Sequence, residues 1–118
     1  MKAPGGKGEI GISLNGDWCE PWDDSKESKA AAQRAQEFWV GWFADPIYGN
    51  GDYPACMREQ LGARLPTFSA EEKALVQNSS DFYGMNHYTS NLIKDKSEPA
   101  AAEDWQVRSA LGNSAFRS

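Results

Sequence analysis

The hydrophobic pattern in the first half of the chain predicts one strand and one long helix. Residues 8–15, GEIGISLN, alternate between large apolar side chains and small or polar ones, which is the period of a strand. Residues 18–22, WCEPW, follow a turn cluster and predict an aromatic loop. Over residues 25–43, apolar side chains recur at helical spacing and form one wide stripe. We expect this helix to end at Asp45-Pro46, because proline cannot continue the hydrogen-bond ladder.

The second half of the chain predicts short helices and one buried strand. A proline before residues 55–61 and a glycine after them favour a short helix there. Ser69 and Glu72 have the spacing of a capping box, which predicts the start of another helix. Residues 81–88 form a continuous apolar run between turn signals, typical of a strand that is buried on both faces. Residues 94–118 show no periodicity, and we expect a loop or a disordered tail.

The predicted order of strand, helices and strand defines an α/β unit with two parallel strands. Consecutive parallel strands joined by a crossover belong to one sheet. Two parallel strands cannot cover both their faces and their edges, so they do not make a stable fold by themselves. The pattern therefore predicts a segment of a larger sheet or barrel.

Composition excludes several classes of function. The net charge is −5 and the pI is about 4.8, which disfavours binding to a phosphate backbone. No run approaches the roughly 20 apolar residues that a membrane span needs. Cys19 and Cys56 lack metal-type spacing and read as two ordinary thiols. His87 is the sole histidine, and a metal site needs three or four ligands, so we expect no metal.

Three motifs carry a resemblance to a known family. They are GEIGISLN, WFADPIYGNGDYP and DFYGMNHYTS, in this order, and they cover about residues 7–93. Together they resemble glycoside hydrolase family 1, and in particular its fungal β-glucosidases. The resemblance implies that residues 1–93 are a partial family 1 segment of a (β/α)8 TIM barrel, with its fifth and sixth strands. It also implies a β-glucoside or cello-oligosaccharide substrate, no cofactor, and a cytoplasmic protein.

The catalytic carboxylates of that family are not found in this sequence. Retaining glycosidases use two carboxylates, one as acid/base and one as nucleophile. In family 1 these are glutamates in Asn-Glu-Pro and Thr-Glu-Asn-Gly motifs, and neither motif occurs here. Cys19-Glu20-Pro21 lacks the asparagine and follows the wrong strand, so we reject Glu20 as the acid/base. We expect an internal fragment that is inactive by itself and whose partner is the missing remainder of the barrel.

The resemblance assigns supporting roles to polar and aromatic residues near the strand ends. Tyr88 would donate a hydrogen bond to the nucleophile carboxylate, and Asn15 and Asn86 would line the substrate site. The alternative for Tyr88 is a buried strand tyrosine with a satisfied hydroxyl. Trp18 is a sugar platform at the rim or simply a loop aromatic. A second hypothesis for the whole chain is a non-catalytic carbohydrate-binding or interaction module.

Overall fold

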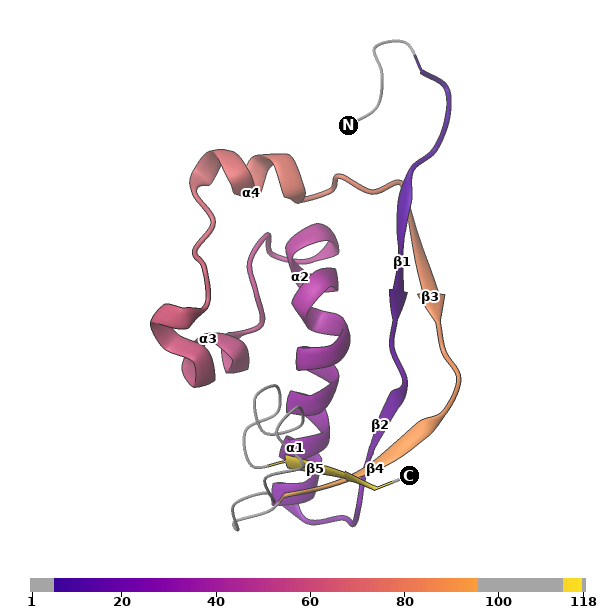
Figure 1. Cartoon of the computed structure of the whole chain (residues 1–118), viewed down its shortest axis with the longest axis vertical. Coiled ribbons are helices and arrows are strands. Elements are labelled where there is room, and N and C mark those ends of the chain that lie inside the picture. Colours follow the sequence, from indigo (N-terminus) through magenta and orange to yellow (C-terminus); the bar gives the residue numbers. More distant parts are fainter. Residues whose placement is uncertain (1–5, 96–113, 118) are drawn as a thin grey trace.

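Two parallel strand pairs run along one side of the molecule (Figure 1). The computed structural model describes residues 6–95 and 114–117. β1 pairs with β3 and β2 pairs with β4, both in parallel. The bounds of these strands are Gly11–Asn15 for β1, Trp18–Pro21 for β2, Phe82–Asn86 for β3 and Ser90–Asp95 for β4. The two parallel strands predicted from sequence are therefore present as β1 and β3, and each is followed, after a short break, by a further strand, β2 or β4.

A continuous helical rod lies beside the strands. It consists of α1 (Lys26–Gln36), a π-helical turn η1 (Glu37–Gly41) and α2 (Trp42–Tyr48). Ser25 caps α1, because its hydroxyl accepts a hydrogen bond from the backbone N–H of Ser28. The predicted end at Asp45-Pro46 is wrong by about one turn. Pro46 is buried within α2, so its packing offsets the one hydrogen bond that its ring removes.

The crossover from β2 to β3 contains the two predicted short helices. α3 spans Ala55–Leu61, and a 3₁₀ turn, η2 (Gly62–Arg64), follows it. α4 spans Ala70–Val76 and begins with the predicted capping box, in which Ser69 and Glu72 bond each other's backbone N–H. None of the helices in the described ranges is long and apolar enough to cross a membrane.

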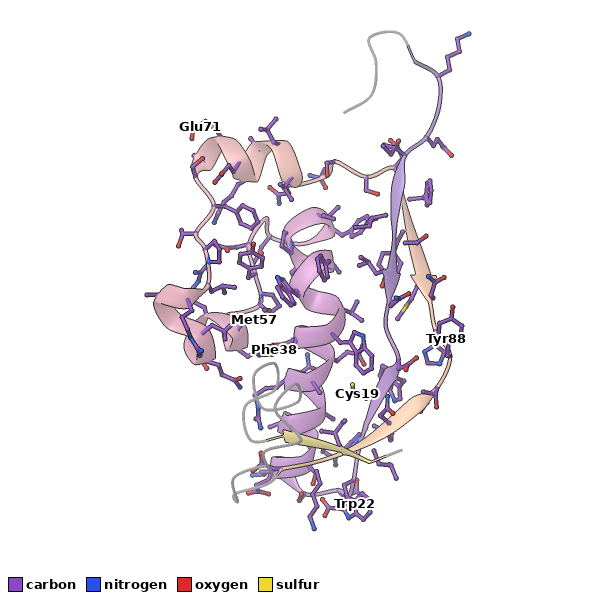
Figure 2. All side chains as sticks on the ribbon, viewed as in Figure 1. Cys19, Trp22, Phe38, Met57, Glu71 and Tyr88 are labelled. Atoms are coloured by element: carbon purple, nitrogen blue, oxygen red, sulfur yellow. The ribbon has the colours of Figure 1, made fainter. Side chains whose placement is uncertain are left out.

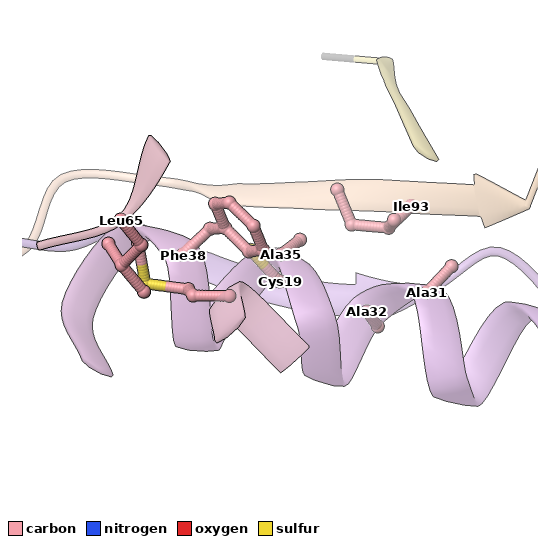
Figure 3. Close-up of a cluster of buried hydrophobic side chains, with 8 residues drawn as sticks. Cys19, Ala31, Ala32, Ala35, Phe38, Leu65 and Ile93 are labelled. Carbon is pink, nitrogen blue, oxygen red and sulfur yellow. The ribbon is translucent and has the colours of Figure 1, made fainter. Parts of the chain in front are cut away.

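The hydrophobic core lies between α1, η1, α3 and the β2–β4 pair (Figure 3). Alanines on α1 allow the helix to approach the strands closely, and Cys19 and Ile93 fill the space from the sheet. The buried cluster consists of Cys19, Ala31, Ala32, Ala35, Phe38, Met57, Leu65 and Ile93. The buried cluster that the described residues form thus lies at one end of the strands (Figure 2).

Three features differ from the sequence expectations. The predicted aromatic loop at residues 18–22 contains strand β2, because the parallel partner β4 supplies its hydrogen bonds. β3 is not buried on both faces: Phe82 and Met85, which lie on opposite faces of the strand, are each nearly half exposed. Within residues 94–118, the described positions are in strands: β4 extends to Asp95, and β5 (Ser114–Arg117) pairs antiparallel with β4. The other residues of that segment lie outside the described ranges.

Candidate functional site at the strand break

The polar residues of interest gather where both strands are interrupted. Asn15 is registered with Asn86, and Trp18 is registered with Ser90. Between these positions one strand has residues 16–17, two residues, and the other has residues 87–89, three residues. The second strand therefore carries one extra residue, which is the definition of a β-bulge. Bulges re-aim side chains and are frequent beside active sites. We call residues 16–17 and 87–89 together the strand break.

Asn15 and Asn86 form a direct cross-strand pair on the near side of the strand break. The Asn86 Nδ2 donates to the Asn15 Oδ1 at 3.0 Å, and both residues are exposed. Registered positions on parallel strands present their side chains to the same face, which explains the contact. Each amide keeps further donor or acceptor capacity for a ligand hydroxyl.

Asp17 connects the two sides of the strand break. Its Oδ1 accepts hydrogen bonds from the backbone N–H of Tyr88 at 3.1 Å and of Thr89 at 3.2 Å. His87 contributes a further contact, with its Nδ1 3.2 Å from the carbonyl oxygen of Gly16. In the sequence, Asp17 belongs to the turn cluster at residues 15–17, and the adjacent Gly16 was the one local signal of a special backbone position. The partner amides lie 71 and 72 positions further along the chain, so sequence reasoning missed this role.

Tyr88 and Trp18 project from the strand break into solvent. Tyr88 is 82% exposed, and Figure 2 shows it on the side of the strands away from α1, whereas Cys19 lies between strand and helix. Trp18 is half exposed, and its indole Nε1 donates to the Glu20 carboxylate at 2.5 Å. Because alternate strand residues face opposite sides, Trp18 and Glu20 lie on the face opposite the buried Cys19. In a barrel whose helices form the outer ring, this face is the inner one.

Tyr88 is therefore not a buried strand tyrosine. Within residues 6–95 no hydrogen bond holds its hydroxyl, so the phenol is available to a group outside them. Of the four residues that the sequence singled out, Asn15, Asn86 and Trp18 border the strand break, and Tyr88 lies within it.

The thiols are not suited to nucleophilic chemistry. Burial, followed by the negative charge of Asp17, raises the pKa of Cys19 to about 11. Burial and the contact with Glu37 raise the pKa of Cys56 to about 12. Both side chains therefore remain protonated at neutral pH, and the thiolate is the reactive form. Among the described residues, no group of three or more His, Cys, Asp or Glu side chains is placed to hold a metal ion.

These features define the class of protein to which the chain belongs. Parallel strands with a helical layer outside and polar groups inside are the arrangement of an α/β barrel, of which the described residues form an open segment. Residues 1–114 match the family described as Glycosyl hydrolase family 1, and the chain belongs to this family.

Relatives in sequence are β-glucosidases from fungi and plants. Beta-glucosidase 1B of Phanerodontia chrysosporium is 62% identical over 87 residues, which are 74% of this chain and 16% of that protein. Beta-glucosidase 34 of Oryza sativa is 54% identical over 88 residues, 75% of this chain and 17% of the rice protein. The chain therefore spans about a sixth of the length of these relatives.

Solved structures show the same local fold. Beta-glucosidase 2 of Trichoderma reesei, crystallised in complex with Tris, superposes with a TM-score of 0.81 at 57% identity. The match covers 98% of this chain and 24% of the Trichoderma chain. A family 1 β-glucosidase of Humicola insolens in complex with glucose gives a TM-score of 0.81 at 52% identity, over 96% of this chain and 23% of that one. The predicted segment of a TIM barrel is confirmed.

Proposed function

We propose that this chain is the part of a retaining β-glucosidase that lines the substrate site, and that it lacks both catalytic glutamates. The parent enzyme would hydrolyse terminal β-D-glucosyl residues without a cofactor, and it would be cytoplasmic. The observation that supports the proposal is the strand break, where the Asn15–Asn86 pair and the exposed Tyr88 border the inner side of two barrel strands. In barrel enzymes, the residues that bind the substrate come from strand ends and from the loops beside them.

Tyr88 has the chemistry to assist a nucleophilic carboxylate. A phenol O–H that donates to a carboxylate stabilises its ionised form and fixes the direction of the attacking oxygen. Because the hydroxyl is free of partners within residues 6–95, this bond would not compete with an internal one. In the retaining mechanism that carboxylate attacks the anomeric carbon, while a second carboxyl group protonates the leaving oxygen. Tyr88 would act on the first of these groups.

The asparagine pair and Trp18 would bind the sugar itself. Asn15 and Asn86 satisfy each other through one hydrogen bond only, which leaves amide donors and acceptors for glucosyl hydroxyls. The indole of Trp18 is held in place by Glu20 and is half exposed, so its face is open to a pyranose ring. Glu20 is engaged by this indole bond, and its role is to orient the tryptophan.

A graft into a complete barrel tests the proposal directly. Residues 6–95 would replace the matched segment of the Trichoderma reesei β-glucosidase 2, to which the chain is 57% identical. The graft should hydrolyse an aryl β-glucoside, and Tyr88→Phe should lower its kcat about 10- to 100-fold, the value of a hydrogen bond to a charged group. Tyr83→Phe is the matched control, since Tyr83 lies on β3 before the strand break and should change kcat by less than about 2-fold.

Equal kcat values for the Tyr88→Phe and Tyr83→Phe grafts would contradict the proposed role of Tyr88. The isolated 118-residue chain gives an independent test. We expect no turnover of the aryl β-glucoside and no single cooperative unfolding transition. Measurable turnover by the purified chain would rule out the proposed absence of catalytic groups.

The alternative function is a carbohydrate-binding module. It is favoured by the exposed rings of Trp18 and Tyr88, because aromatic faces pack against sugar rings. Titration of the 118-residue chain with glucose and cellobiose, followed by tryptophan fluorescence, separates the two functions. Saturable binding by a folded monomer would support a binding module. A flat titration together with an active graft supports the β-glucosidase segment.

A further inference from the structure

We propose that Asp17 is a positioning residue for Tyr88: its carboxylate replaces the strand partner that the β-bulge lacks. The inference rests on the proposed role of Tyr88 and adds a residue that acts through it. Asp17 itself would touch neither the sugar nor the reacting atoms. Its effect would be to hold the backbone from which the phenol projects.

The bulge creates a need for hydrogen-bond acceptors. Residues 87–89 face only residues 16–17 across the strand break, so the parallel ladder cannot serve every amide. The carbonyl of Thr89 accepts from the backbone N–H of Trp18 at 3.1 Å, which closes the far side of the strand break. The amides of Tyr88 and Thr89 remain, and a single oxygen of Asp17 accepts from both. A charged acceptor shared by two successive amides is stronger than a neutral one.

Asp17 is itself fixed from three directions. Before it, the Gly16 N–H donates to the Asn86 carbonyl at 3.0 Å. Its own carbonyl oxygen accepts from the Gln36 Nε2 at 3.4 Å, and the same side chain accepts from the Cys19 N–H at 3.0 Å. Gln36 is the last residue of α1, so the backbone of Asp17 is tied to the helical layer, while its carboxylate bonds the facing strand.

The close approach of the helical rod at this point also requires a glycine. A Cβ on Gly16 would lie 2.4 Å from the Val40 Cγ2 and 2.7 Å from the Met85 Cε. Val40 belongs to the π-helical turn η1, which contacts the strand just before Asp17. Gly16 therefore lets the strand approach the rod, and Asp17 follows at a position that packing has already determined.

Tyr88 depends on this arrangement because its ring has little other support. The side chain is 82% exposed, and within residues 6–95 its hydroxyl is unbonded. The direction of the phenol is then set by the backbone at Tyr88, which the Asp17 carboxylate holds through the Tyr88 N–H. Displacements of about 1 Å in a catalytic arrangement are enough to cost about 100-fold in rate.

The experiment compares two substitutions of Asp17 in the graft described above. Asp17→Leu removes the acceptor at nearly the same size, and it should lower kcat about 10-fold with little change in KM. Asp17→Asn keeps an oxygen acceptor without the charge, and it should lose only about 2- to 3-fold. Asp24→Leu is the same chemical change at a fully exposed position, beyond the end of β2 that lies away from Asp17, and it should leave kcat unchanged. Circular dichroism confirms that each variant is folded.

A double-mutant cycle decides whether Asp17 acts through Tyr88. In a Tyr88→Phe background, Asp17→Leu should add less than a 2-fold loss, because the hydroxyl that it positions is gone. Full additivity of the two losses, or equal kcat values for Asp17→Leu and Asp17→Asn, would overturn the inference.

Amide exchange in the graft gives a readout that does not depend on catalysis. Asp17→Leu should speed hydrogen exchange at the Tyr88 and Thr89 amides about 10-fold or more, and Asp17→Asn should speed it less. Unchanged exchange would overturn the inference, whatever the activity. Faster exchange together with no effect of Tyr88→Phe on kcat would instead refute the proposed function and leave the backbone contact standing.

Discussion

The two parallel strand pairs have the same pairing but very different surroundings. In the β2–β4 pair, Cys19 is 4% exposed and Ile93 is fully buried against α1. In the β1–β3 pair, Phe82, Tyr83 and Met85 are each more than 40% exposed. Both pairs are two-stranded and parallel, so strand pairing does not cause the difference. The cause is the position of α1, whose alanine face lies on β2 and β4.

The comparison shows which part of the barrel segment is complete by itself. A two-stranded sheet needs a covering layer to be stable. α1 covers the β2–β4 pair, whereas the β1–β3 pair has the shorter cover of η1 and α2, with Leu14 buried and Tyr83 packed on Tyr48. The β1–β3 pair carries apolar side chains of the kind that neighbouring strands and helices bury in a barrel. The strand break lies at the boundary between the two pairs. Hydrogen bonds to Gln36 of α1 fix its backbone on the helical side, and Tyr88 is exposed on the other side.

The largest expected effect is the loss of packing at Ile93. Ile93→Ala removes a fully buried side chain from the contact between β4 and α1, and it should cost about 2–5 kcal/mol. Met85→Ala on β3 removes a side chain that is 43% exposed and should cost less than about 1 kcal/mol. The measurement is the urea concentration at which the 118-residue chain loses half of its helical signal at 222 nm, a value that can be compared between variants without a single cooperative transition. Equal shifts for the two variants would mean that the two strand pairs are equally packed.

Hydrogen exchange should separate the two pairs in the unaltered chain. Amides of α1 and β4 share the core, so their local opening costs more than that of β3, whose faces are exposed. We expect exchange at least 10-fold slower in α1 and β4 than in β3, as measured by NMR or mass spectrometry. In the graft, where the rest of the barrel covers β1 and β3, the gap should narrow. A β3 as protected as β4 in the isolated chain would remove the basis of the comparison.

The smallest expected effect concerns the crossover, which belongs to neither pair. Asp52 accepts from Lys73 Nζ at 2.7 Å and from Arg58 Nη2 at 3.2 Å, which links α3 to α4. The pKa of Asp52 is below its usual 3.8, mainly because of the hydrogen bond from Lys73 and next because of the hydrogen bond from the Tyr53 N–H. A lowered carboxyl pKa gives stability that is present above pH 3.8 and is lost as the pH falls through the folded-state value.

Asp52→Asn should therefore cost about 1 kcal/mol or less at neutral pH, because the ion pairs are partly exposed. The variant should also lose less stability on acidification below pH 3.8, because it has no carboxyl group at position 52 to protonate. An acid titration of the 222 nm signal compares the variant with the unaltered chain. Identical acid profiles for the two would show that the crossover does not depend on this cluster.

Local signals in the sequence were sufficient for most elements. The helical stripe located α1, the Ser69–Glu72 capping box located α4, and alternation located β1. These features act over three or four residues, so the chain carries them without help from its fold. The resemblance of the DFYGMNHYTS stretch also directed attention to Asn86 and Tyr88, which the structure places at the strand break.

Distant contacts decided the rest. Residues 18–22 contain proline and two tryptophans and read locally as a loop, yet pairing with β4, about 70 residues away, makes them strand β2. Residues 87–89 form a bulge only because the facing strand has two residues, 16–17, over the same stretch. Asp17 looked like an ordinary turn residue until the fold brought two unpaired amides to its carboxylate. The sequence by itself determined which side chains are available, and the tertiary structure decided which backbone holds them, because hydrogen-bond partners 70 residues apart leave no periodic trace along the chain.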